Sequence, residues 1–452
     1  MTITYILIFV LLFHIILFKK MIFRWNTFGI FFIATMIFSV VGVMAYPFMI
    51  DYVMITFNTF KLELITSQEI IKTQLLVVGG LLTVLYSYTI GIWALYGRVE
   101  CIDHFRMEAP IKNNLSKTNF YFILLLIFLF LSVYLFIKRD ILITGIVDGL
   151  IGRQPTALLI SRIGITSNYL YVVITYNLLP FLTIVALYVS MKRKTLVSRI
   201  LFIGLFIVSF SLILLLFQKR PLIIFLLSLL LSAFIFRKYI HIKEKRILTR
   251  KEKKKLRRRY ALIGLALFSI LILLYYSGTT YQFKSVFSGV TKLTEVVLTR
   301  IFGRLALPAF CYVHYFPNVE GHYGITNIGT LSKVFRYQTF LDSKEVFLHF
   351  TRTDEKQGSL AINSILDFYG AFGYYGLIIG NMILGFFLCG LDAFLNRLEK
   401  NNINLIFIIF CFVFAYYLSQ ASMARSLLGY GFFFFAITWM FLQKGFKVKL
   451  RP

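Results

Sequence analysis

The chain has few charged residues and few cysteines, and it lacks the motifs of nucleotide-binding proteins. Only 15% of its 452 residues are charged, which is far from the composition of a soluble domain. The four cysteines are scattered without CxxC or Cys/His spacing, so we expect neither a disulfide framework nor a zinc site. There is no P-loop and no dinucleotide fingerprint, which argues against an ATP-driven exporter and a nucleotide-sugar transferase.

Long apolar runs fill most of the chain, and 59% of its residues are hydrophobic. Runs that can cross a hydrocarbon core of about 30 Å predict an all-α polytopic membrane protein. We expect about eleven spans: 4–18, 27–49, 74–96, 119–137, 168–191, 200–217, 221–236, 260–277, 368–391, 404–420 and 428–443. The first run precedes Lys19 and Lys20 and has no basic residue before it, so we interpret it as a retained helix, not a signal peptide.

The net charge of +29 orients this chain in the membrane. Residues 237–259 carry thirteen Lys or Arg and two acidic residues, which predicts a cytoplasmic segment. The same run could bind anionic lipid or RNA. A nucleic-acid partner is not expected, because no soluble basic domain is present. Alternation from this segment predicts an outside N-terminus and a cytoplasmic C-terminus.

The predicted topology divides the chain into three parts. Residues 1–277 contain eight spans and the outer segments 50–73 and 138–167. Residues 278–367 form one large polar segment outside the membrane, and residues 368–452 contain three spans and a cytoplasmic tail. A membrane protein that exports one long polar segment is expected to build its site there.

Basic residues on the predicted outer face run against the positive-inside tendency and therefore indicate a ligand. The planar guanidinium of arginine matches phosphate and pyrophosphate oxygens. Arg153 precedes a helix that we expect to start at Pro155, where free backbone N–H groups also favour an anion. Arg162 follows on that helix as a second candidate.

A tight corner at Lys219 and Arg220 places two cations between two long apolar runs. Its nearest surroundings are the lipid headgroups, so the corner either clamps a ligand or extends its side chains to lipid phosphates. Arg425 lies in a further short outer segment, 421–427.

The large polar segment holds the remaining candidates. Arg300 and Arg304 share one face of a helix expected over 290–305, which could also be an amphipathic helix on the membrane surface. His314, His322 and His349 are the histidines of the outer face, and His314 is our candidate base.

After this segment, Asp367 lies at the mouth of the next span as a second candidate base. Further along the span, Gly376 and Gly380 form a face of small residues that would let a neighbouring helix approach closely.

Three stretches of the chain resemble the Wzy-type polymerases of O-antigen and polysaccharide repeat units, and more distantly the O-antigen ligases. The run from Arg153 to Gly164 looks like the arginine-to-glycine pattern of their outer loops. Lys219-Arg220-Pro221-Leu222 looks like the basic corner that opens a helix in that superfamily. Asp367-Phe-Tyr-Gly-Ala-Phe-Gly-Tyr-Tyr-Gly is similar to the run that starts the helix after the large outer loop.

The resemblance implies a metal-independent, GT-C-like glycosyltransferase without a cofactor. Its substrate would be an undecaprenyl-pyrophosphate-linked oligosaccharide, extended into a surface polysaccharide such as O-antigen, capsule or exopolysaccharide. The catalytic base would be His314 or Asp367. The pyrophosphate and sugars would be bound by Arg153, Arg162, Lys219, Arg220, Arg300, Arg304 and Arg425.

Two alternatives stay open at this point, an O-antigen ligase or other lipid-linked-sugar transferase and a polysaccharide flippase or transporter. A transporter is expected to show internal repeats and intramembrane charges, which this sequence has little of. Membrane lipids are expected partners, and a chain-length regulator and a flippase are further candidates.

Overall fold

The computed structural model describes residues 1–56, 59–99, 101–105, 113–147, 155–215, 219–242, 306–322, 324, 342–352, 360, 362–429 and 431–444. These residues form helices and no strand, apart from isolated bridges. The all-α prediction is therefore confirmed for this part of the chain.

Among the described residues, six helical segments are long and apolar enough to cross a membrane: Thr27–Phe48, Ser67–Tyr96, Lys117–Ile137, Tyr169–Arg193, Leu196–Leu214 and Ser364–Arg397. Shorter apolar helices cover Thr2–Leu17, Pro221–Arg237, Asn402–Leu418 and Phe432–Leu442. The predicted span 260–277 lies outside the described residues. By the length and composition of its helices, the protein is membrane-embedded.

Contacts between residues divide the chain into two compact units. Unit 1 comprises Met1–His104, Phe283–Arg397 and Phe414–Leu428, and unit 2 comprises Phe105–Gln282, Leu398–Val413 and Gly429–Pro452. The helix α20 (Asn402–Leu418) and the π-helical turn η8 (Arg425–Gly429) cross the boundaries between them.

Unit 1 begins with a series of short and long helical elements. They are α1 (Thr2–Leu17), α2 (Lys19–Ile22), α3 (Thr27–Thr35), η1 (Met36–Val40), α4 (Val41–Ala45), η2 (Tyr46–Phe48), α5 (Ile50–Thr56), η3 (Leu62–Leu64) and α6 (Ser67–Tyr96). After the residues of unit 2 it continues with α16 (Leu307–Asn318), α18 (Asp342–Phe350) and α19 (Ser364–Arg397).

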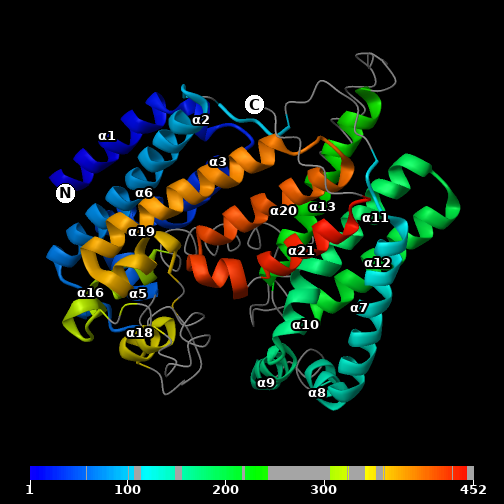
Figure 1. The fold of residues 1–452 in the computed structure, drawn as a ribbon. Helices are drawn as coiled ribbons and strands as arrows, with labels where there is room; N and C mark the ends of the chain where they lie inside the picture. Colours follow the sequence, from blue (N-terminus) through cyan, green and yellow to red (C-terminus); the bar gives the residue numbers. More distant parts are fainter. Residues whose placement is uncertain are drawn as a thin grey trace, which may run out of the picture. The chain divides into compact units, whose positions relative to one another are not determined.

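The parallel pair α6 and α19 forms the centre of unit 1 (Figure 1). Gly385 makes this close approach possible, because a side chain there would collide with the backbone of Val84 and Tyr88 on α6. Further along both helices, Gly91 of α6 packs against Cys389 of α19. The contact positions advance together along the two chains, so both helices run in the same direction from one end of the unit to the other.

A break at Gly373 divides α19 into two helical pieces. Gly373 has φ 65° and ψ −147°, which an L-residue with a side chain adopts only with strain. A side chain at Gly376 or Gly380 would collide with Phe368 of the first piece. Close packing at these glycines is thus confirmed, but the element that approaches them is the start of α19 itself and not a separate helix.

The large polar segment contains a buried helix, which its average polarity did not predict. In α16 the residues from Leu307 to Val313 are all buried, and the helix packs against α6 and α19. This part of the segment therefore belongs to the core of unit 1. The helix predicted over 290–305 lies outside the described residues.

Besides the part of α20 up to Val413, the described helical elements of unit 2 are α7 (Lys117–Ile137), α8 (Arg139–Thr144), α9 (Pro155–Thr166), α10 (Tyr169–Val173), η5 (Ile174–Leu178), α11 (Leu179–Arg193), α12 (Leu196–Leu214), α13 (Lys219–Ile242) and α21 (Phe432–Leu442). The prediction of a helix from Pro155 is confirmed by α9. The π-helical turn η5 comes directly before Pro180. A proline ring clashes with the preceding turn of a regular α-helix, and the wider π-helical turn avoids this clash. In the segment 169–193, 83% of the most apolar stretch of residues is buried inside the protein. In α7 and α12 most of the corresponding apolar stretch is exposed, as in helices that face lipid.

Candidate functional site

Glu69 is fixed at the N-terminal end of α6 by a capping box with Thr66. The Thr66 hydroxyl accepts from the Glu69 backbone N–H, and Glu69 Oε2 accepts from the Thr66 backbone N–H at 2.8 Å. Both interactions satisfy donors and acceptors that a helix start leaves unpaired. The cap occupies one carboxylate oxygen and leaves Oε1 facing α16.

His314 and Asn318 of α16 both donate to this second oxygen. The helix is interrupted between them, because Phe316 has non-helical backbone angles. His314 Nδ1 and Asn318 Nδ2 nevertheless both reach Glu69 Oε1, at 2.9 and 2.8 Å. Because a carboxylate oxygen accepts, Nδ1 of the neutral imidazole carries the proton and Nε2 keeps a lone pair. The arrangement makes Nε2 a proton acceptor, with Glu69 behind it to stabilise the imidazolium.

His349 of α18 lies beside His314. The two imidazole centroids are 6.1 Å apart with nearly stacked planes, and Tyr315 meets His349 edge-on. Burial, the nearby His314 and Lys61 lower the pKa of His349 below its usual range. His349 Nε2 is buried and has no hydrogen-bond partner among the described residues. We call Glu69, His314, Asn318 and His349 the Glu69 cluster.

A short backbone pairing holds α18 next to the start of α6. Lys61 donates its N–H to the Phe350 carbonyl at 2.7 Å, and the Arg352 N–H donates to the Thr59 carbonyl at 2.8 Å. The Arg352 guanidinium adds an ion pair with Glu63 at 2.6 Å, in which both side chains are half exposed. These contacts fix His349 relative to Glu69. Figure 1 shows α5, α16 and α18 gathered at one end of unit 1.

A cation and two tyrosines extend the cluster along α6 toward α19. Lys72 follows Glu69 by one helical turn, and its Nζ lies 5.5 and 5.6 Å from the ring centroids of Tyr369 and Tyr374. The Tyr369 hydroxyl donates to the Phe316 carbonyl at 3.1 Å, which ties α19 to the end of α16. His322 packs edge-on against Tyr369 from the chain that follows α16. The end of unit 1 therefore presents a base, a cation and aromatic rings together.

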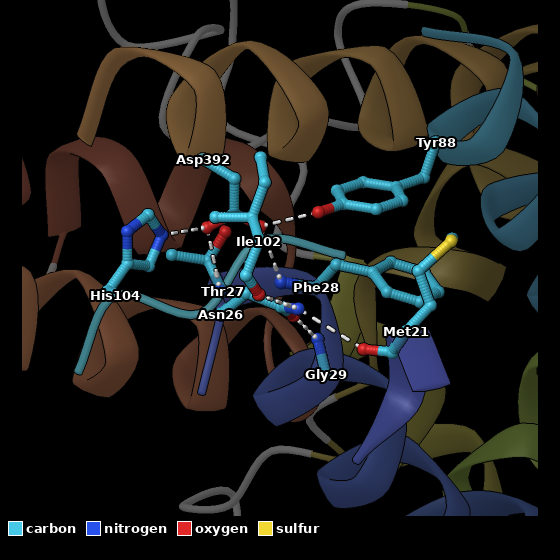
Figure 2. Close-up of polar contacts among 9 residues, drawn as sticks. All are labelled: Met21, Asn26, Thr27, Phe28, Gly29, Tyr88, Ile102, His104 and Asp392. Carbon is cyan, nitrogen blue, oxygen red and sulfur yellow. Dashed lines mark hydrogen bonds and ion pairs between the residues drawn. The ribbon is translucent and has the colours of Figure 1, made fainter. Parts of the chain in front are cut away.

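A second polar cluster lies at the other end of α6 and α19 and is centred on Asp392 (Figure 2). Asp392 Oδ1 accepts from His104 Nε2 and from the Thr27 N–H, each at 2.8 Å. Oδ2 accepts from the Tyr88 hydroxyl at 3.0 Å and from the Phe28 N–H at 3.3 Å. We call these five residues the Asp392 cluster.

The Asp392 cluster is sealed from solvent. The side chains of both His104 and Asp392 are 0% exposed, whereas those of His314 and Glu69 are 15% and 12% exposed. Asn26 caps α3 below it and donates to the carbonyls of Met21 and Ile102 (Figure 2). The Asp392 carboxylate thus accepts the first free N–H groups of α3 and joins α3, α6 and α19.

Comparison with protein-family models, with curated proteins and with solved structures finds no match to this chain. Its function must therefore be argued from the geometry of its own residues.

Of the predicted site residues, His314 lies in the Glu69 cluster. Asp367 is buried in the first turn of α19, two residues before Tyr369. Arg425 is exposed and opens η8. The other candidates are placed only by backbone or lie outside the described residues. Arg162 lies on α9, Lys219 and Arg220 begin α13, and Arg153, Arg300 and Arg304 are not described.

The prediction did not include Glu69, Asn318 and Lys72. A signal for Glu69 was present, because Thr66-Ser-Gln-Glu69 before an apolar run is a capping-box pattern. That pattern predicts where a helix begins, but it does not show that the second carboxylate oxygen faces a histidine 245 residues away. His349 was a candidate histidine whose neighbour could not be predicted.

Proposed function

We propose that this protein is a membrane glycosyltransferase that joins undecaprenyl-pyrophosphate-linked oligosaccharide repeat units into a surface polysaccharide. The observation that carries the proposal is the pair of His314 and Glu69, with Lys72 and two tyrosines beside it. A histidine oriented by a carboxylate is suited to remove a proton from a hydroxyl group. Aromatic rings pack on sugar faces, and cations stabilise a departing pyrophosphate.

In the proposed reaction, His314 Nε2 takes the proton of the acceptor sugar hydroxyl. The hydroxyl oxygen then attacks the anomeric carbon of the donor glycan and forms the new glycosidic bond. The bond from that carbon to the pyrophosphate oxygen breaks, and undecaprenyl pyrophosphate leaves with the bonding electrons. Glu69 stabilises the imidazolium formed in the process.

The pyrophosphate would be held by cations. Lys72 is one candidate, since it lies one turn from Glu69, the partner of the proposed base. We further propose the predicted outer-face residues for binding pyrophosphate and sugars: Arg153, Arg162, Lys219, Arg220, Arg300, Arg304 and Arg425. Arginine remains charged when it is partly desolvated, which suits a site at the headgroup level.

We further propose a bacterial inner-membrane protein with about eleven spans and a GT-C-like fold. The charge pattern supports an extracytoplasmic site in it. It assigns the start of α6, residues 278–367 and the start of α19 to the outer face. A donor that arrives already activated on a lipid removes the need for a nucleotide site on that side.

The test is the glycan ladder of a strain that lacks the gene and carries a plasmid copy of the wild type or of a variant. With His314→Gln we expect the ladder to collapse to single repeat units, since general-base catalysis contributes about 10²- to 10⁴-fold. His14→Gln is the matched control, because His14 lies on α1 and its Nε2 contacts the Tyr86 hydroxyl outside the Glu69 cluster. Immunoblotting of membranes checks that both variants are present in equal amounts.

The glycan products also separate the alternatives. Loss of a ligase would leave no glycan on the surface lipid, and loss of a flippase would leave lipid-linked units on the cytoplasmic side. A normal ladder with His314→Gln would contradict the proposed base. Asp367→Asn is tested in parallel, and a collapse with this variant alone would transfer the role of base to Asp367.

A further inference from the structure

The short helix α18 covers the proposed base. Its last residue, Phe350, meets the His314 ring edge-on with the centroids 5.4 Å apart, and His349 lies beside the same ring at 6.1 Å. With these two rings against it, the His314 side chain is 15% exposed. Because an acceptor hydroxyl must reach Nε2 of this ring, the position of α18 decides how much of the imidazole a substrate can contact.

Two opposing effects act on α18 in this closed position. Val346 and Phe350 on its inner side are 0% exposed, which favours packing against α16. His349 Nε2 is also buried and has no hydrogen-bond partner among the described residues, which is unfavourable for a polar atom. A displacement of α18 would give this nitrogen water or a sugar hydroxyl as a partner.

Three interactions join the end of α18 to the residues before α6, and we call them the clasp. Two are the backbone hydrogen bonds that flank the antiparallel bridge between Phe60 and Thr351. The third is the ion pair of Glu63 with Arg352, in which both side chains are half exposed. Exposed ion pairs contribute little to stability, so the clasp can open while the long helices of unit 1 stay folded.

We propose that α18 is a lid over the Glu69 cluster, which the clasp holds closed and which opens to admit the acceptor sugar to His314. The acceptor in this statement rests on the proposed function, whereas the movement of the helix can be measured without turnover. A substrate that binds only the open form shifts the equilibrium toward that form. A closed lid also keeps water, a competing acceptor, away from the base.

A disulfide across the clasp locks the lid. The hydrogen bonds make Phe60 and Thr351 a non-hydrogen-bonded antiparallel pair, whose Cα atoms lie about 4.5 Å apart, within the range of a disulfide. The full-length protein carries Phe60→Cys and Thr351→Cys together with Cys101→Ser, because Cys101 is exposed and would compete for pairing. The same protein reduced with dithiothreitol is the control.

The readout is the rate at which diethyl pyrocarbonate modifies His314 in detergent, measured by mass spectrometry of peptides. His322 is the reference in the same sample, because it is exposed and lies outside the clasp. We expect the disulfide to slow the modification of His314 by roughly tenfold or more, since it removes a minor open form. The rate for His322 should not change, and reduction should restore at least the wild-type rate for His314.

A second pair of variants tests the opposite direction. Glu63→Gln/Arg352→Gln removes the ion pair of the clasp without changing the net charge, and the modification of His314 should become about two- to fivefold faster. Arg139→Gln/Asp140→Asn removes an exposed ion pair of α8 and should leave the rate unchanged. An equal rise in both pairs would contradict the lid.

Glycan extension by the oxidised and reduced disulfide variant separates the lid from the proposed function. We expect the oxidised form to lose extension and reduction to restore it. Equal modification rates of His314 in the two forms would overturn the lid, whatever the activity. If the disulfide protected His314 while extension continued, the lid would stand and His314 would not be the base.

Discussion

The two ends of the α6–α19 pair each contain a histidine bound to a carboxylate, at nearly the same distance but through different ring nitrogens and in different surroundings. The Nδ1–Oε1 distance in His314–Glu69 is 2.9 Å, and the Nε2–Oδ1 distance in His104–Asp392 is 2.8 Å. At about 1.5 Å of rise per residue, roughly 28 Å of α6 separates Glu69 from Tyr88. This length is close to the thickness of a hydrocarbon core.

The difference lies in what else each carboxylate binds. Asp392 receives four hydrogen bonds, two of them from the backbone of α3, and its cluster is closed to solvent. Glu69 also caps a helix, but its second oxygen faces a histidine that is partly accessible. The same pair of groups is therefore suited to join helices at one end and to transfer a proton at the other.

The Asp392 cluster should show the largest effect on stability. In Asp392→Asn the amide cannot accept all four donors, and breaking a buried charge pair costs about 3–5 kcal/mol. We expect the free energy of unfolding, measured by thermal denaturation in detergent, to fall by that amount. Asp140→Asn is the control, because Asp140 is 85% exposed and its ion pair with Arg139 contributes about 0–1 kcal/mol. Similar losses in both variants would show that the Asp392 cluster does not anchor α3.

The Glu69 cluster should instead show an effect on turnover. Glu69→Gln keeps the size of the side chain but removes the charge that stabilises the imidazolium of His314. We expect kcat for glycan extension to fall by roughly a hundredfold or more, with KM little changed. Glu69 acts through His314, so its role is that of a positioning residue.

The matched variant for this prediction is Thr66→Val, which removes the cap without touching His314. Its cost is about 1 kcal/mol of stability, with turnover kept. If Thr66→Val lowered kcat as much as Glu69→Gln, the carboxylate would matter only as part of the helix start. Measurement of kcat, KM and the melting temperature on both variants separates these outcomes.

The helices could be predicted from the sequence because span length and apolar composition are local properties. Each predicted span with described residues overlaps a helix, and Pro155 begins α9 as expected. The burial of α16 could not be predicted in this way. Its twelve residues are too few for a span and lie within a polar segment, so only the contacts with α6 and α19 reveal them as core.

Only part of the site could be predicted, because the sequence indicates which residue types are candidates but not which of them meet in the fold. His314 was a candidate because histidine is a common base, and Arg300 and Arg304 were candidates because of their charge. The partner of His314 is set by the fold, through a residue that caps the start of α6. His104 and Asp392 are 288 residues apart, and neither carries a motif that predicts the other. Pairings of this kind depend on helix packing, which local patterns do not encode.

The smallest expected effect concerns pH and again separates the two ends. Burial first, and then the charges of His314 and Lys61, lower the pKa of His349 in the folded protein. The unfolded chain therefore binds a proton at higher pH than the folded chain does. Stability from this group is complete above the ordinary histidine pKa of about 6.5 and is lost as the pH falls toward the folded value.

We expect the melting temperature of the wild type to fall between pH 7.5 and pH 5.5 and His349→Asn to reduce the fall. His322→Asn is a control, because His322 is exposed and contacts the Gly370 carbonyl. An unchanged fall in His349→Asn would mean that His349 titrates alike in both states. If the pH dependence instead disappeared in Asp392→Asn, the sealed cluster would be the pH-sensitive one, and the proposed division between the two ends would be reversed.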